Sequence, residues 1–249
     1  MKSFLMVLLV FTVTSCDKGR SLITSTAKAN EKEALEAAGV KLHYFSNGKI
    51  RAKIPMDNDD KRHGVSQMFY PSGELKSEVT YDHGVRQQAK QYYKNGKLEM
   101  AFQYKEGMKQ GVRKKYWDSG QLQSELEYHR NEAGMGLVEY NRKGKQLTQY
   151  PTLKVREIDN ISTTGEYIVE VFFSEKPSRG TYYRGELIDG QFKHKGLLEI
   201  EKVGGKGRMV FKPAPGTFMM EKMHFVGSYK TLYGNPYLQS VSVNVAFEN

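Results

Sequence analysis

The sequence predicts an all-β protein in which an array of antiparallel β-hairpin repeats, residues 41–150, is followed by an immunoglobulin-like β-sandwich, residues 151–249. Three observations lead to this fold class. A glycine-centred pattern recurs five times at a spacing of 23 to 25 residues, which is typical of repeat architectures. Apolar and polar residues alternate in both halves, as they do in half-buried strands. The 249 residues include 24 Gly, 16 Tyr and 12 Phe but 7 Pro, a composition that favours antiparallel sheet.

The first 15 residues have the layout of an export signal. Lys2 is followed by the apolar run Phe4–Phe11 and by small residues that end at Cys16, the single cysteine of the chain. The apolar run is too short to span a bilayer, so it indicates a signal peptide rather than a structural helix. The segment resembles a bacterial lipoprotein signal, in which Cys16 is lipidated and becomes the first mature residue. The alternative is an ordinary secretory signal with an incidental cysteine.

This resemblance implies a protein anchored in the bacterial cell envelope, with the membrane as its partner through the lipid. We expect the outer membrane rather than the inner one, although Asp17 after the cysteine retains lipoproteins in the inner membrane of some bacteria. One thiol allows no internal disulfide, so burial must hold the exported fold together. Residues 16–40 predict a polar tether that ends in a short helix, Glu31–Ala38, with Asn30 as its cap and Gly39 as its stop.

Each copy of the repeat predicts one β-hairpin. Aromatic residues stand four positions before every central glycine and three positions before four of them; these glycines are Gly48, Gly73, Gly96, Gly120 and Gly144. The dipeptides Ser72-Gly73 and Asn95-Gly96 favour tight turns, because glycine adopts the positive φ that other residues resist. A single hairpin is marginal in water, so we expect stacked copies to stabilise one another.

The copies follow the pattern aromatic-aromatic-x-x-Gly-x-Leu and then Tyr-x-x-Gly, here at residues 92–98 and 104–107. This pattern resembles the bacterial variant of the MORN repeat, as in proteins named YwqK-family antitoxins. The resemblance covers about residues 41–150 and implies hairpin arrays that act as interaction surfaces. The antitoxin name implies neutralisation of a toxin partner. Gln87 and Gln88 replace a late glycine of the pattern, and Asn131 replaces the glycine after Tyr128.

The repeats also supply a candidate binding surface. Of the formal net charge of +10, residues 41–150 contribute +7, from 20 Lys and Arg against 13 Asp and Glu. A second aromatic in each copy predicts a column of outward rings beside basic side chains: Tyr70, Tyr93 and Trp117 with Arg113, Lys114 and Lys115. Such a surface suits another envelope protein or an anionic glycan, whereas nucleic acid does not fit an exported protein. The alternatives are a solvated lysine-rich surface and a sheet covered on both faces, with these rings in the core.

After Pro151 the period is lost, and seven short strands alternate with turn signals. They are expected at residues 153–158, 166–174, 181–188, 196–200, 208–212, 218–226 and 238–247. Short strands at regular spacing indicate an antiparallel sandwich of immunoglobulin-like type.

No motif of catalysis or metal binding stands out, so we expect neither an enzyme nor a cofactor. The six histidines lack zinc-site spacing and cysteine partners, and they are expected on the surface or in turns. Asp57, Asp59 and Asp60 would open a calcium loop, but its twelfth position holds Met68 instead of glutamate. Gly204-Gly205-Lys206-Gly207 lacks the Ser or Thr and the helix of a phosphate loop.

The sequence therefore predicts an envelope-anchored lipoprotein that acts as a non-catalytic binding or scaffold module. The first alternative is an antitoxin or immunity protein that neutralises a toxin partner. The second is a hydrolase of envelope polymers, which would need a deep cleft lined by paired carboxylates.

Overall fold

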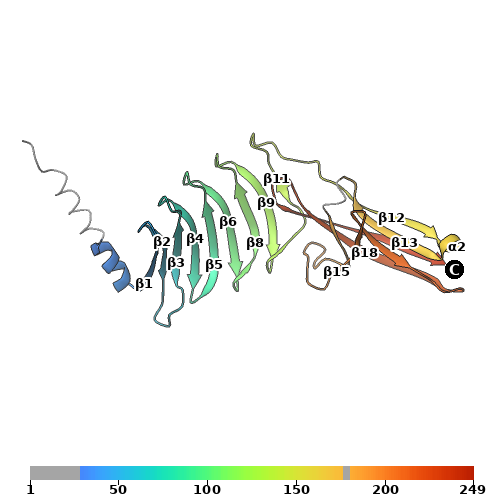
Figure 1. Cartoon of the computed structure of the whole chain (residues 1–249), viewed down its shortest axis with the longest axis horizontal. Coiled ribbons are helices and arrows are strands. Elements are labelled where there is room, and N and C mark those ends of the chain that lie inside the picture. The colour runs from blue at the N-terminus through green and yellow to red at the C-terminus, as the bar shows by residue number, and fades with distance from the viewer. Residues whose placement is uncertain (1–28, 176–179) are drawn as a thin grey trace, which may run out of the picture.

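The computed structural model describes residues 29–175 and 180–249 and places a long repeat sheet beside two smaller sheets (Figure 1). The predicted signal peptide, Cys16 and the tether up to residue 28 lie outside the described residues. Residues 29–37 are helical, and Gly39 after them has a φ of +75°, so the predicted short helix and its stop are confirmed. Asn30 lies inside the helix, so the prediction that it caps the helix is wrong. No helix among residues 29–175 and 180–249 is long and apolar enough to cross a membrane.

The repeat region forms one antiparallel sheet in which neighbours in sequence are neighbours in space. The main path runs β1-β2-β3-β4-β5-β6-β8-β9-β10, with β7 paired to β6 and β11 to β9. The strands are β1 (Val40–Tyr44), β2 (Ile50–Pro55), β3 (Gly64–Phe69), β4 (Leu75–Asp82), β5 (Val85–Tyr92), β6 (Leu98–Lys105), β7 (Met108–Lys109), β8 (Gly111–Tyr116), β9 (Leu122–His129), β10 (Glu132–Ala133) and β11 (Val138–Glu139). The predicted array of hairpins is confirmed.

The turns explain why the period is so regular. All five central glycines have positive φ, between +77° and +113°, which residues with a Cβ adopt only at a cost. At the opposite ends of the strands, both residues of His83-Gly84, Glu106-Gly107 and Arg130-Asn131 have positive φ, as two-residue hairpin turns of type I′ require. Asn131, with a φ of +76°, substitutes for the missing glycine because asparagine tolerates this conformation.

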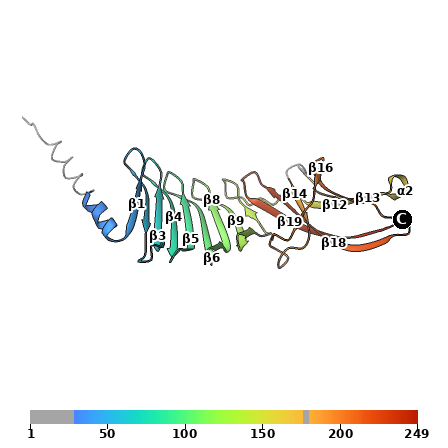
Figure 2. The same ribbon diagram turned by 60° about the horizontal axis from the view of Figure 1, so that its bottom comes forward.

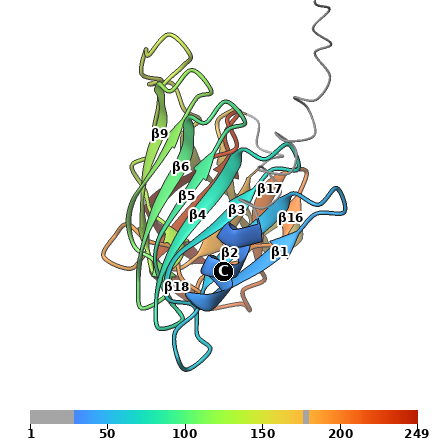
Figure 3. The same cartoon turned by 90° about the vertical axis from the view of Figure 1, so that its left-hand side faces the viewer.

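A β-bulge recurs at the same place in the first four copies. The register shifts at His43/Tyr44, Met68/Phe69, Gln91/Tyr92 and Lys115/Tyr116, each time next to the turn. Bulges increase the local twist of a strand pair, and the end view shows successive strands turned relative to one another along the array (Figure 3). The fifth copy contributes an isolated bridge, Tyr140↔Gln146, instead of a full hairpin.

The C-terminal region contains two four-stranded sheets, ordered β12-β13-β17-β16 and β15-β14-β18-β19. The elements are β12 (Leu153–Asn160), α2 (Ile161–Thr164), β13 (Glu166–Phe173), β14 (Thr181–Arg184), β15 (Leu198–Glu199), β16 (Lys202–Val203), β17 (Lys206–Phe211), β18 (Phe218–Lys230) and β19 (Pro236–Glu248). One apolar core joins the sheets, with Val169, Val171 and Phe173 from the first and Phe225 and Val245 from the second. The two sheets therefore form a face-to-face pair.

The strand order has the same neighbours as the ABED and CFG sheets of immunoglobulin domains with a C′ strand added. This is a likeness of strand order alone, and the immunoglobulin-like assignment stays a prediction.

One predicted boundary differs in a way that matters for the site. The sequence places strand ends at Val226 and Leu238, but β18 and β19 continue to Lys230↔Pro236. The extension packs against the core: the half-buried Tyr229 and Tyr237 contact the ring of Phe173, and a Cβ on Gly227 would meet Phe173 within 3 Å. The longer hairpin brings its tip, residues 231–235, to the repeat sheet near β8 and β9 (Figure 2).

Candidate binding face of the repeat sheet

The pairing register defines two faces of the repeat sheet, because directly paired residues point to the same side. One face carries a row across seven strands: Ala52, Met68, Ser77, Gln91, Met100, Lys115 and Ser124. We call it the docked face, since Lys115 on it contacts the C-terminal hairpin. The opposite face carries the row Lys53, Gln67, Glu78, Lys90, Ala101, Lys114 and Glu125.

The predicted aromatic column connects each copy to the next. The Tyr70 hydroxyl donates a hydrogen bond to the carbonyl of Tyr92 at 2.9 Å, and the Tyr93 hydroxyl donates to the carbonyl of Tyr116 at 2.8 Å. In the last full copy, Trp117 Nε1 donates to the carbonyl of Tyr140 at 3.2 Å. These rings therefore have a structural role, in which a side chain of one copy satisfies a backbone acceptor of the next.

A second repeating contact places cations on the tyrosines of the docked face. Arg62 donates to the hydroxyl of Tyr81 at 2.9 Å, and its guanidinium lies 5.3 Å from that ring. Lys109 lies 5.7 Å from the ring of Tyr128. Burial opposes ionisation of Tyr81, but Arg86 and Arg62 outweigh it and lower the pKa of this hydroxyl.

Positive charge is concentrated along the same rows. Burial, followed by the charges of Arg113 and Arg86, lowers the pKa of Lys109. Burial, followed by the charge of Arg113, also lowers the pKa of Lys115. Burial is the larger cause of both shifts, and the nearby cations add to it, so an anionic group beside these lysines would be favoured.

At β8 and β9 the docked face holds the tip of the β18–β19 hairpin. Arg113 Nη2 donates to Asn235 Oδ1 at 2.7 Å, and Lys115 Nζ donates to the carbonyl of Tyr233 at 3.2 Å. The Tyr233 ring meets Trp117 edge to face, with centroids 4.9 Å apart. Arg113 and Trp117 are 6% and 8% exposed, so the hairpin covers this end of the face.

A buried polar network holds the hairpin tip in place around Glu139. Its Oε1 accepts hydrogen bonds from Asn235 Nδ2 at 2.6 Å and from the Thr231 hydroxyl at 2.7 Å. Its Oε2 accepts one from the Tyr150 hydroxyl at 3.2 Å. Asn235 therefore bridges the carboxylate of Glu139 to the guanidinium of Arg113, and a buried charge pair is satisfied through a neutral amide.

The structure divides the predicted surface residues into three groups. Tyr70 and Tyr93 are half-buried in the open copies of the array. Arg113, Lys115 and Trp117 contact the chain's own hairpin, so Arg113 and Trp117 do not form the open surface that the sequence predicts. Lys114 lies on the opposite face, where it pairs with Glu125 at 3.2 Å beside a hollow of about 690 Å³. Three consecutive basic residues cannot share one face, because side chains alternate along a strand.

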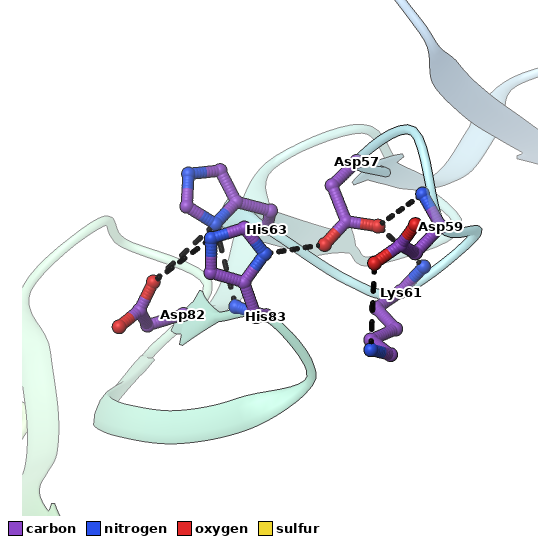
Figure 4. A network of polar contacts seen from close by, with 6 residues as sticks. All are labelled: Asp57, Asp59, Lys61, His63, Asp82 and His83. Atoms are coloured by element: carbon purple, nitrogen blue, oxygen red, sulfur yellow. Dashed lines mark hydrogen bonds and ion pairs between the residues drawn. The ribbon is translucent and has the colours of Figure 1, made fainter.

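Sequence reasoning missed a polar cluster at one edge of the sheet. Asp57, His63 and His83 have ligand-type atoms within 4.8 Å of one another, and they come from two neighbouring turns (Figure 4). The hydrogen bond from the backbone N–H of Lys61 is the largest cause of the lowered pKa of Asp57. Burial raises this pKa, and the hydrogen bond to His83 lowers it further. No spacing motif marks this group, because the repeat itself brings residues of adjacent copies together.

Residues 39–130 match the model of the MORN repeat variant in four segments. The matched segments are residues 39–58, 62–83, 88–106 and 109–130, which correspond to the hairpins of the array. MORN repeats generally mediate binding or scaffolding, and the family is typically non-enzymatic.

Other comparisons add little. No curated protein matches the chain. A solved structure titled "Crystal structure of GtfA/B complex bound to UDP and GlcNAc" is similar at 16% identity over 45% of this chain and 22% of that chain, with a TM-score of 0.21. This chain thus spans about a fifth of that chain's length, and a likeness this small carries no argument about function.

Proposed function

We propose that this protein is an envelope-anchored, non-catalytic binding module whose docked face holds a partner protein in the copies that its own hairpin leaves open. The proposal is carried by a contact within the chain itself. At β8 and β9 the docked face binds the tip of the β18–β19 hairpin through Arg113, Lys115 and Trp117. The same face continues without such a cover over the earlier copies.

The open copies differ from the covered one in chemistry. Lys115 contacts the hairpin in the covered copy. In the earlier copies the equivalent position of the row is held by Gln91 and Met68. Met68 is 47% exposed, and Met100 and Phe102 are half-buried. Methionine and phenylalanine at an accessible surface favour protein contacts, because flexible and aromatic side chains fit an apolar partner.

Basic side chains border this apolar strip. At one end, Lys94 lies 5.8 Å from the ring of Tyr70. At the other end, Arg62 and Arg86 surround Tyr81. A contact segment with an apolar centre and acidic flanks complements this arrangement. A glycan lacks the apolar centre, so the surface favours a protein partner.

Location in the envelope rests on the predicted lipoprotein signal, and it has its own test. Labelled palmitate is expected to enter the wild-type protein and to be lost in Cys16→Ala. Equal labelling of both proteins would contradict the lipid anchor without affecting the binding proposal.

The binding proposal is tested with a photo-cross-linking amino acid at two positions of β3 in the full, membrane-targeted chain. Met68 is on the docked face and Val65 is on the opposite face, and both side chains are similarly exposed, at 47% and 45%. We expect a protein adduct from position 68 in intact cells and none from position 65. The same adducts from both positions, or adducts from position 65 alone, would refute a partner on the docked face. A secreted toxin in the adduct would favour the immunity alternative.

A further inference from the structure

Two neighbouring turns at the strand ends of the repeat sheet bring together four side chains of metal-ligating types. Asp57 lies in the loop between β2 and β3, and His63 directly precedes β3; Asp82 and His83 belong to the turn between β4 and β5. His83 Nδ1 lies 2.7 Å from Asp57 Oδ2, and His83 Nε2 lies 3.9 Å from Asp82 Oδ1. His63 Nδ1 lies 3.5 Å from the same Asp82 oxygen.

The two imidazoles lie between the two carboxylates (Figure 4). Their ring centroids are 4.5 Å apart, and the ligand atoms of Asp57, His63 and His83 lie within 4.8 Å of one another. Tetrahedral zinc with bonds of about 2.1 Å holds its ligand atoms about 3.4 Å apart. Both histidines are exposed, so rotation of these side chains can make up the difference.

The charges around the cluster favour a bound cation. Asp59 and Asp60 in the same loop have lysine partners: Lys61 at 3.6 Å and Lys41 at 2.6 Å. Asp57 and Asp82, by contrast, make ion pairs only with histidines among residues 29–175 and 180–249. In a chain with a net charge of +10, two carboxylates that are paired with histidines alone are an unusual local excess of negative charge.

The loop also presents Asp57 in a fixed orientation. Asp57 Oδ1 accepts hydrogen bonds from the backbone N–H groups of Asp59 at 3.0 Å and Lys61 at 2.8 Å. These bonds leave Oδ2 directed at His83. Supporting hydrogen bonds of this kind orient the first ligands of metal sites in proteins.

We propose that Asp57, His63 and His83 bind one divalent first-row transition ion, with zinc as the reference ion and water as the remaining ligand. Two imidazole nitrogens and one carboxylate oxygen suit zinc, cobalt or nickel better than calcium or magnesium, which prefer oxygen ligands alone. The ion would join the first and second copies of the repeat, so it would stabilise the N-terminal end of the docked face.

The repeat supplies a variant that separates the metal role from a structural one. His63 Nδ1 accepts the backbone N–H of His83 at 3.3 Å. In a later copy, Gln110 Oε1 accepts the backbone N–H of Arg130 at 3.2 Å in the equivalent turn. The substitution His63→Gln therefore keeps this hydrogen bond and removes the imidazole ligand.

The test uses the purified full chain without a histidine tag. Calorimetric titration with zinc chloride is expected to give one ion per chain, and both His63→Gln and His83→Gln are expected to weaken binding at least about tenfold. Cobalt is expected to give the absorption bands of a four-coordinate site in the wild type and to lose them in both variants. His194→Gln, at a half-buried histidine of the C-terminal region far from the cluster in sequence, should bind as the wild type does.

Thermal unfolding provides the second measurement. Zinc is expected to raise the Tm of the wild type, since a ligand of the folded state stabilises it, and to leave the Tm of His63→Gln unchanged. Equal zinc affinity in the wild type and both variants, or no saturable binding by the wild type, would overturn the proposal. The Tm of His63→Gln without metal, close to that of the wild type, would show that the turn itself is intact.

Discussion

Replacing Asn235 by alanine should separate the C-terminal hairpin from the repeat sheet. Asn235 is 1% exposed, and its amide joins Arg113 at 2.7 Å to Glu139 at 2.6 Å. The substitution removes both hydrogen bonds at once. The carboxylate keeps the hydroxyls of Thr231 and Tyr150 as donors, but the buried charge pair loses the amide that bridges it.

The magnitude follows from the charges involved. A hydrogen bond to a charged group contributes about 1.5–3 kcal/mol, and a buried group left without a partner costs a similar amount. Two such bonds give an expected loss of about 3–6 kcal/mol in the free energy that holds the hairpin on the sheet. The other contacts of the Arg113 guanidinium, to the hydroxyls of Tyr128 and Ser124, are both 3.4 Å long, so they replace little of what Asn235 provides.

The chain contains its own probe for this junction. Trp117 is the single tryptophan, and its ring contacts Tyr233 at the hairpin tip, with centroids 4.9 Å apart. Urea unfolding followed by tryptophan fluorescence therefore reports the junction directly. With a urea m value of about 2 kcal/mol per molar, a loss of about 4 kcal/mol lowers the midpoint by about 2 M.

Asn47→Ala is the matched control. Asn47 is exposed, and its side-chain amide donates one hydrogen bond to the next copy, to the carbonyl of Pro71 at 3.1 Å. A neutral, exposed bond contributes about 0.5–1 kcal/mol, so the control should shift the fluorescence midpoint far less. If Asn235→Ala shifts it no more than Asn47→Ala does, the buried network does not hold the hairpin in place, and the reasoning is refuted.

Three further predictions concern the repeats. Tyr93→Phe removes the hydroxyl that donates to the next copy and should cost about 1 kcal/mol in urea unfolding followed by circular dichroism; no loss would contradict a structural role. Hydrogen bonds from Gln67 and then Tyr92 lower the pKa of Glu78 below its usual 4.5, so this stabilisation is present above that value and is lost as the pH falls through the folded-state pKa. Tyr92→Phe should reduce the stability lost between about pH 7 and about pH 3, and an unchanged loss would contradict the linkage. Gly96 has a φ of +79° with open space around a Cβ, so Gly96→Ala should cost about 1–2 kcal/mol from backbone strain alone, and Gly96→Asn should cost less in the same urea assay.

The repeat and its turns could be predicted from the sequence because their causes are local. Glycine at a fixed interval dictates positive φ, and alternation of apolar and polar residues dictates which side chains share a face. Asn131 departs from the pattern, yet it adopts a φ of +76° for a reason that is itself local. The approximate positions of most C-terminal strands followed from the same signals.

The bulges and the length of the β18–β19 hairpin were not predictable in this way. Gly227 and Gly234-Asn235-Pro236 suggest a long turn, since glycine and proline punctuate local structure. The strands continue to Lys230 and Pro236 because the half-buried Tyr229 and Tyr237 pack against Phe173. This packing involves residues more than fifty positions apart, which no local pattern reveals.

The sequence by itself determined a hairpin array with a regular period, a second all-β region and the side chains available to the binding face. Only the tertiary structure decided which of those side chains remain open. Arg113 meets Asn235 across 122 residues, and Asp57 meets His83 across 26. Contacts of this kind depend on how strands and turns from distant parts of the chain pack together, and a linear pattern of residue types carries no record of that packing.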